Sequence, residues 1–151
     1  HGKNFYNVGS MGHVNALGLE IALQQKNRVY VFDGDGALIM HMGSLGVIGF
    51  FNPKNLTHII FDNRSHESTG GQPTVSSSMD FIKILQGCNY SDVIKVETEN
   101  QLMQALKETN DCLRGVVIKT NIGSRKDLER PTDTPRDTKH RFMENISEAK
   151  K

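Results

Sequence analysis

The chain has 151 residues, the size of one ordinary domain, and its composition is that of a globular protein, with 36% hydrophobic and 23% charged residues. This composition excludes a mainly disordered chain, a collagen-like chain and a disulfide scaffold. The net charge of +1 at neutral pH gives no electrostatic reason to bind nucleic acid or an anionic membrane.

Short apolar runs alternate with helical patterns along the first 119 residues. Runs of β-branched and aromatic residues predict strands, whereas apolar residues spaced three and four apart predict helices. In chain order, we expect helix 12–25, strand 28–32, helix 37–51, strand 57–61, helix 79–86, strand 92–96, helix 99–109 and strand 115–119. Strands that alternate with helices form βαβ units, so the sequence predicts an α/β fold, a three-layer α/β/α domain with a mainly parallel sheet.

The character of the chain changes after residue 123, because residues 124–151 hold 8 basic and 6 acidic residues. We expect residues 1–123 to form the domain and residues 124–151 to form a charged tail with a short helix, packed on the same domain or on a partner. The start at His1, where an initiator Met would stand, predicts a piece of a longer protein. Two cysteines and the absence of a long apolar run favour a cytoplasmic protein.

Two polar turns follow the first two expected strands. Residues 33–36 read DGDG and residues 62–65 read DNRS. The carboxyl ends of neighbouring parallel strands meet at one edge of a sheet, so Asp35 and Asn63, 28 positions apart, are expected to lie close together there. Glycines and a helix N-terminus favour a phosphate, and Mg²⁺ would reconcile that phosphate with the acidic side chain.

Two simpler interpretations of the DGDG turn remain open. It could be an ordinary strand-to-helix turn that is rich in Asp and Gly. It could also be the turn of a nicotinamide-binding domain, although residues 34–39, GDGALI, lack the third glycine of that fingerprint.

The segment from Gly34 to Asn63 resembles the signature of thiamine diphosphate enzymes, in which GDG is followed by Asn after an apolar helix and a second strand. The resemblance implies that Asp35 and Asn63 supply side-chain ligands to Mg²⁺ and that Ser65 supplies its main-chain carbonyl. It also implies that Gly34, Gly36 and Ala37 line the diphosphate. The chain departs from the family at Asp62, where Asn is usual.

A second glycine turn, Gly9-Ser10-Met11-Gly12, precedes the first expected helix. By the same resemblance, Gly9, Ser10 and Met11 bind the cofactor: the Gly9 carbonyl accepts from the aminopyrimidine and Met11 wedges the cofactor into a bent conformer. The alternative is a surface turn that begins a helix.

Four segments together resemble the phosphonopyruvate decarboxylase family, with the sulfopyruvate decarboxylase beta subunit as a close relative: VGSMGH (8–13), DGDGALIMHMGSL (33–45), HESTGGQPT (66–74) and RPTDTP (130–135). The resemblance implies decarboxylation of a 2-oxo acid with thiamine diphosphate and Mg²⁺. His66 is the candidate catalytic residue, since histidine often relays protons near neutral pH; the alternative is a structural hydrogen bond. His41, on the apolar helix, is expected to be a core residue. The resemblance implies that His13 reaches the cofactor edge and that Arg64 and Gln72 touch the phosphonate, although Arg64 stands where the family often has a small residue.

The same family also needs a Glu beside the pyrimidine, and none of the glutamates here matches it by motif position. We therefore expect a pyrimidine-binding domain as partner, from an N-terminal part of the same polypeptide or from an alpha subunit, and a homo-oligomer. Gly43, Gly46 and Gly49 recur every three residues in the expected helix and predict close packing against another helix, within the chain or across a subunit interface. Alone, the chain could be a non-catalytic cofactor-binding or assembly module.

Overall fold

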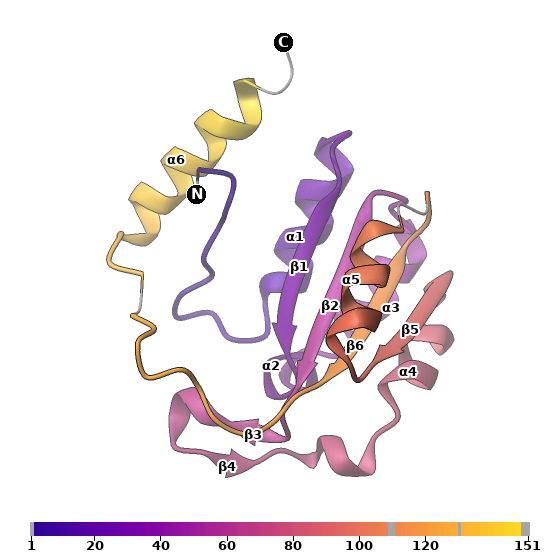
Figure 1. The fold of residues 1–151 in the computed structure, drawn as a ribbon. Helices are drawn as coiled ribbons and strands as arrows, with labels where there is room; N and C mark the ends of the chain where they lie inside the picture. Colours follow the sequence, from indigo (N-terminus) through magenta and orange to yellow (C-terminus); the bar gives the residue numbers. More distant parts are fainter. Residues whose placement is uncertain (1, 109–110, 130, 149–151) are drawn as a thin grey trace. The chain divides into compact units, whose positions relative to one another are not determined.

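The computed structural model describes residues 2–108, 111–129 and 131–148. They divide into two compact units, Gly12–Gly123 and the combination of His1–Met11 with Ser124–Lys151. The larger unit carries the sheet, and the smaller unit carries the last helix (Figure 1).

Four parallel strands form the sheet of the larger unit, in the order β1-β2-β6-β5 (Figure 1). Their bounds are β1 (Val29–Gly34), β2 (Leu56–Asp62), β5 (Asp92–Val96) and β6 (Arg114–Lys119). The register pairs Gly34 with Phe61 and Asp62 with Lys119. The carboxyl ends of β1, β2 and β6 therefore meet at one edge, and the predicted α/β fold with a mainly parallel sheet is confirmed.

Helices pack on both faces of this sheet. They are α1 (Val14–Gln24), α2 (Asp35–Met40), α3 (Ser44–Phe51), α4 (Phe81–Gly87) and α5 (Glu99–Lys107). The larger core cluster joins α1, α2, α3 and α4 to one face of the sheet, and the smaller joins α5 to the other. Adjacent residues of β2 show the division, because Ile60 belongs to the first cluster and Ile59 to the second.

The predicted single helix over residues 37–51 is wrong. The structure divides it into α2 and α3, which are separated by a turn at residues 41–43. The Ser44 hydroxyl donates to the His41 carbonyl at 2.8 Å, and this side-chain bond competes with continued helix. His41 consequently lies exposed on the turn, so its predicted place in the core is also wrong.

The predicted face of three glycines is only partly right. A Cβ on Gly49 would lie 1.6 Å from the Cys88 carbonyl oxygen, so the backbone of α3 packs closely on the turn after α4, not on a helix. Gly43 and Gly46 have nothing within 4 Å of the corresponding position. Only Gly49 is explained by a close approach within the larger unit.

The two helical glycines give a matched pair of substitutions. Gly49→Ala is expected to destabilise the fold by roughly 1–3 kcal/mol, because the new methyl group meets a backbone carbonyl that cannot move aside. Gly46→Ala is expected to stabilise α3 by about 1 kcal/mol, since Ala is the better helix former and the site is open. Urea unfolding of both variants checks the opposite signs, and equal effects would contradict the close approach at Gly49.

The segment between β2 and α4 has more structure than the sequence predicted. It forms a short antiparallel hairpin of β3 (Ser65–His66) and β4 (Gln72–Pro73), with 3-10 turns at Glu67–Thr69 and Val75–Ser78. Strands of two residues leave almost no alternating pattern in a sequence, so the hairpin could not be recognised there.

The smaller unit contains α6 (Pro135–Glu148), the helix expected in the tail. Phe5 packs edge-on against Phe142 of α6, with ring centroids 5.6 Å apart. Among the described residues, no helix has the length and apolar character needed to cross a membrane. The expected end of a helix at Thr109 and the start of the RPTDTP motif at Arg130 lie outside the described residues.

Candidate cofactor site

The end of β1 and the start of α2 place two buried carboxylates two positions apart in the chain. Asp33 and Asp35 are 4% and 2% exposed. The Asp33 carboxylate accepts from the Gly34 N–H at 3.0 Å, which fixes the start of the turn. Asp35 begins α2, and its Oδ2 accepts a hydrogen bond from the Thr74 hydroxyl at 2.5 Å.

A buried histidine supports Asp33 from the middle of the neighbouring strand. His58 on β2 is fully buried, with Nε2 3.4 Å from Asp33 Oδ2 and Nδ1 3.2 Å from the Tyr90 hydroxyl. Burial, and secondarily the charges of Cys88 and Asp33, raise the pKa of the Tyr90 phenol far above its usual value. Tyr90 therefore stays protonated, and its hydroxyl can donate to Nδ1 of His58.

The turn after β2 presents oxygen atoms at the same edge of the sheet. Asn63 Oδ1 accepts from the Ser65 N–H at 3.0 Å, and Asn63 Nδ2 donates to Glu67 Oε2 at 2.7 Å. These two bonds fix the orientation of the Asn63 amide. Ser65 is buried opposite Pro73 in the hairpin, and proline has no N–H to offer to the Ser65 carbonyl.

His66 lies directly on the glycine turn. Its Cε1 and Nδ1 are each 2.5 Å from the point that a Cβ on Gly36 would occupy, whereas nothing lies within 4 Å of the same point on Gly34. Glycine is thus required at position 36 for the His66 ring to pack there, and the backbone at Gly34 is open to a ligand. Ala37 follows within α2 and is half-buried.

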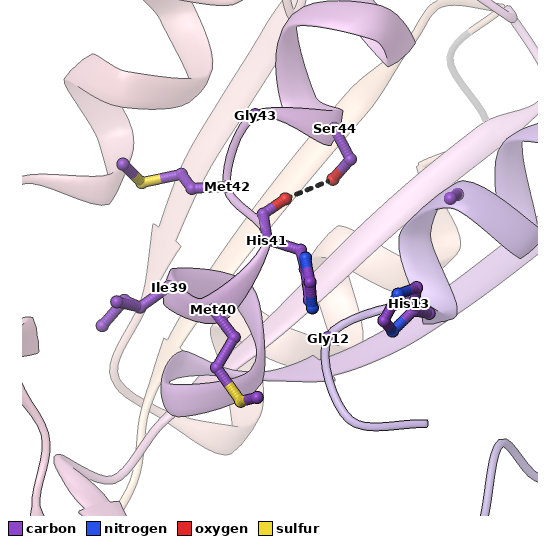
Figure 2. A pocket seen from close by; sticks show the side chains of 9 residues that line it. Gly12, His13, Ile39, Met40, His41, Met42, Gly43 and Ser44 are labelled. Atoms are coloured by element: carbon purple, nitrogen blue, oxygen red, sulfur yellow. Dashed lines mark hydrogen bonds between the residues drawn. The ribbon is translucent and has the colours of Figure 1, made fainter. Parts of the chain in front are cut away.

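A groove of about 560 Å³ runs between the start of α1 and the turn that joins α2 to α3 (Figure 2). The rings of His13 and His41 approach each other in this groove, with centroids 4.2 Å apart (Figure 2). Gly12 has a φ of +85°, and a Cβ there would lie 2.5 Å from His41 Cδ2, so glycine is needed for this approach. The predicted contact of His13 with the cofactor stays a prediction.

The remaining predicted residues belong to the smaller unit or have exposed side chains. Gly9, Ser10 and Met11 belong to the smaller unit; Gly9 has a φ of +81°, and the Asn7 amide donates to the Ser10 carbonyl at 2.8 Å. Their predicted contact with the pyrimidine stays a prediction. Arg64 and Gln72 are both exposed, and their contact with a phosphonate also stays a prediction.

The oxygen-rich edge fits a hard cation. Asp35 is a buried carboxylate, and no ion pair among the described residues involves it. Buried charges are normally paired with an opposite charge or bound to a metal, so a cation beside Asp35 would supply the partner that this carboxylate lacks among the described residues. In the part of the chain that the structure describes, no three His, Cys, Asp or Glu side chains gather at one point, so a cation here would use carboxylate, amide and carbonyl oxygens together.

Five supporting residues were missed by the sequence analysis. They are the residues whose side chains contact the predicted ligands or the neighbouring carboxylates of Asp33 and Asp62: His58, Glu67, Thr74, Ser76 and Lys119. Only Glu67 and Thr74 carried a signal, because both lie in the loop that resembled the decarboxylases. The others depend on strand pairing and loop folding that bring distant residues together.

Parallel strands with an acidic glycine turn at their carboxyl edge define an α/β domain whose candidate ligand site lies at that edge. Residues 3–119 match the family described as thiamine pyrophosphate enzyme, C-terminal TPP binding domain. The chain belongs to this family, and its cofactor is thiamine diphosphate, also called thiamine pyrophosphate.

Several known proteins are similar to the chain. A phosphonopyruvate decarboxylase of Streptomyces viridochromogenes is 38% identical over 93% of this chain and 36% of its own length. A sulfopyruvate decarboxylase subunit beta of Methanocaldococcus jannaschii is 36% identical over 95% of this chain and 77% of its own length. The chain thus spans little more than a third of the Streptomyces relative.

A solved structure shares the fold at lower identity. It is a candidate thiamin diphosphate-dependent enzyme of Mycobacterium smegmatis, which matches 77% of this chain and 23% of its own length with a TM-score of 0.56 and 15% identity. This likeness is independent support for the fold alone.

Proposed function

We propose that the chain is the diphosphate- and Mg²⁺-binding half of a 2-oxo acid decarboxylase that uses thiamine diphosphate. The observation that carries the proposal is the buried Asp35 carboxylate, which lacks a cationic partner among the described residues and stands at the glycine turn of a thiamine pyrophosphate family domain. Asp35, Asn63 and the Ser65 carbonyl hold the cation. Gly34, Gly36 and Ala37 line the diphosphate, and Gly9, Ser10 and Met11 hold the pyrimidine.

We further propose that the reaction converts phosphonopyruvate to phosphonoacetaldehyde and carbon dioxide. The support is the 38% identity to the Streptomyces phosphonopyruvate decarboxylase together with the resemblance of the 66–74 loop. The cofactor supplies the electron sink that takes up the electron pair left when carbon dioxide departs. The chain supplies the position of that cofactor and a proton for the product.

His66 is the proposed proton donor to the product. The packing of its ring on Gly36 brings an imidazole to the turn that lines the diphosphate, and its position at the end of β3 keeps it half-buried. Arg64 and Gln72 remain candidates for holding the phosphonate.

His66→Gln is expected to lower kcat by about 100-fold or more, because loss of general acid–base catalysis typically costs that much. The affinity for thiamine diphosphate should stay unchanged, since Gln fills a similar space above Gly36. Steady-state kinetics together with a cofactor titration separate the two quantities. A variant with unchanged kcat would leave His66 with a structural role only.

The proposed partner is a pyrimidine-binding domain that supplies the missing Glu, in a homo-oligomer. One face of α3 is apolar and exposed: Val47, Phe50 and Phe51 are 50%, 82% and 51% exposed, and the space above Gly46 is open. An exposed cluster of large apolar side chains commonly marks a protein interface.

Because the proposed reaction needs the Glu of the partner domain, the 151-residue chain by itself is expected to be inactive. Steady turnover by this chain alone would contradict the proposal.

A second candidate function is that of a beta subunit of sulfopyruvate decarboxylase. The observation that favours it is the 36% identity to the Methanocaldococcus subunit beta over 95% of this chain. As an isolated chain it would then act as a cofactor-binding and assembly module until the alpha subunit joins it.

A turnover comparison tests these proposals. The complete protein, loaded with Mg²⁺ and thiamine diphosphate, is assayed for carbon dioxide release from phosphonopyruvate, sulfopyruvate and pyruvate. We expect the highest kcat/KM with phosphonopyruvate. A preference for sulfopyruvate would support the second candidate, and no release from any 2-oxo acid would contradict both.

A further inference from the structure

Two buried hydroxyl groups connect the carboxylates at the ends of β1 and β2. Thr74 and Ser76 are 7% and 1% exposed. The Thr74 hydroxyl donates to Asp35 Oδ2 at 2.5 Å, and the Ser76 hydroxyl donates to Asp62 Oδ1 at 2.8 Å. The two hydroxyl oxygens are 3.0 Å apart.

The neighbouring polar groups determine that the Thr74 hydroxyl donates its hydrogen to Asp35. A hydroxyl has one hydrogen, and a carboxylate can only accept, so the Thr74 hydrogen points to Asp35 and the Ser76 hydrogen points to Asp62. The Ser76 N–H donates to Thr74 Oγ1 at 3.3 Å, which occupies the acceptor side of the same hydroxyl. Thr74 is therefore held as a donor to Asp35.

Lys119 on β6, the strand beside β2 in the sheet, is the last residue in this series of contacts. Asp62 is fully buried and forms an ion pair with Lys119 at the end of β6. The register places Asp62 and Lys119 opposite each other on β2 and β6. Position 62 is also where the chain departs from the Asn expected from the family signature. The buried charge that this departure introduces is neutralised by Lys119.

We propose that Thr74, Ser76, Asp62 and Lys119 form a positioning relay for the cation ligand Asp35. The inference rests on the proposed function, because it assumes that Asp35 binds the cation. Because Thr74 occupies Oδ2, the other carboxylate oxygen of Asp35 would be the one to bind the cation. The same bonds tie the 65–78 loop, which carries His66, to the edge of the sheet, so that ligand geometry and loop position depend on one another.

Removal of the Thr74 hydroxyl tests the relay in the complete protein. Thr74→Val keeps the shape of the side chain but loses the donor, and Thr74→Ser restores it. Thr69→Val is the matched control, since the Thr69 hydroxyl is on the same loop but is exposed and donates to the His66 carbonyl. Mn²⁺ affinity, measured by electron paramagnetic resonance in the presence of thiamine diphosphate, is one readout. Hydrogen exchange of residues 65–78 without cofactor is the other.

We expect Thr74→Val to weaken Mn²⁺ binding about 10-fold or more and to speed exchange in the loop, as expected for the loss of a hydrogen bond to a charged group. Thr74→Ser and Thr69→Val should behave like the wild type. Unchanged exchange and unchanged Mn²⁺ affinity in Thr74→Val would overturn the relay. If the wild type itself fails to bind Mn²⁺ with the cofactor, the proposed function fails, and loop exchange alone then decides whether the relay exists.

The charge at position 62 gives a second, independent test. Lys119→Met leaves the buried Asp62 carboxylate without its cation, so we expect weaker Mn²⁺ binding and faster loop exchange. The double variant Asp62→Asn/Lys119→Met removes both charges while Asn still accepts from Ser76, and it should recover most of the wild-type behaviour. Equal defects in the single and double variants would overturn the coupling of Lys119 to the site.

Discussion

Asp35→Asn is expected to lower the Mg²⁺-dependent affinity for thiamine diphosphate by about 100-fold or more. Loss of a residue that merely orients a metal ligand costs about 10–100-fold in metal affinity, and Asp35 is proposed to be the charged ligand itself. Asparagine is isosteric and still accepts a hydrogen bond from the Thr74 hydroxyl, so the fold should be retained. Isothermal titration with thiamine diphosphate, with Mg²⁺ and then with EDTA, measures the effect.

Without metal, the thermal stability of Asp35→Asn should be equal to or higher than that of the wild type, although its cofactor affinity is lower. Without metal, the wild type holds a buried carboxylate that has no cationic partner among the described residues, and Asn removes this cost. In EDTA, Asp35→Asn should therefore unfold at the same temperature as the wild type or higher. The control is Asp127→Asn, whose carboxylate pairs with Arg125 on the surface. Wild-type cofactor affinity in Asp35→Asn would contradict the metal assignment.

Arg114→Met is expected to cause the largest loss of stability, about 3–5 kcal/mol, because it removes several hydrogen bonds that one buried guanidinium makes. The Arg114 side chain is 3% exposed at the start of β6. It donates to the carbonyls of Ala105 and Glu108 at the end of α5, and its Nε lies 2.9 Å from Asp92 Oδ2. Methionine fills part of the volume but leaves the last carbonyls of α5 and Asp92 without the guanidinium.

Thermal and urea unfolding of the complete protein measure this loss, and Arg125→Met is the matched control. Arg125 forms an exposed ion pair with Asp127, and such pairs contribute about 0–1 kcal/mol. Arg114→Lys should be intermediate, since Lys keeps the charge but cannot reach several acceptors at once. Equal stability of Arg114→Met and Arg125→Met would contradict a structural role for the buried network.

Much of the fold was predictable because strands and helices leave periodic patterns. The apolar run GVVI correctly indicated a strand buried on both sides, whereas the run VYVF forms the edge strand β1, in which Tyr30 and Phe32 are exposed. Apolar residues at helical spacing indicated helices where α1 and α5 form. The break at His41 was not predictable from hydrophobicity, because residues 37–51 are mostly apolar and the Ser44 hydroxyl bond after α2 leaves no periodic pattern. The two-residue strands of the hairpin are likewise too short to show alternation.

The candidate site was predictable only as far as its contacts follow from sheet topology. Asp35 and Asn63 could be placed at one edge because both follow parallel neighbouring strands. The support from His58, Thr74, Ser76 and Lys119 could not be foreseen, since it depends on side chains that meet only after the loop folds back over the strand ends. The position of His66 on Gly36 depends on the same folding.

The central claim is that Asp35, Asn63 and Ser65 together hold the cation that anchors the diphosphate. The most direct measurement is a crystal structure of the complete protein with thiamine diphosphate and Mn²⁺, with the metal located by its anomalous scattering. We expect one Mn²⁺ at about 2.0–2.4 Å from the Asp35 carboxylate, the Asn63 side-chain oxygen and the Ser65 carbonyl. Bound cofactor with the metal elsewhere, or with none at these three residues, would contradict the claim.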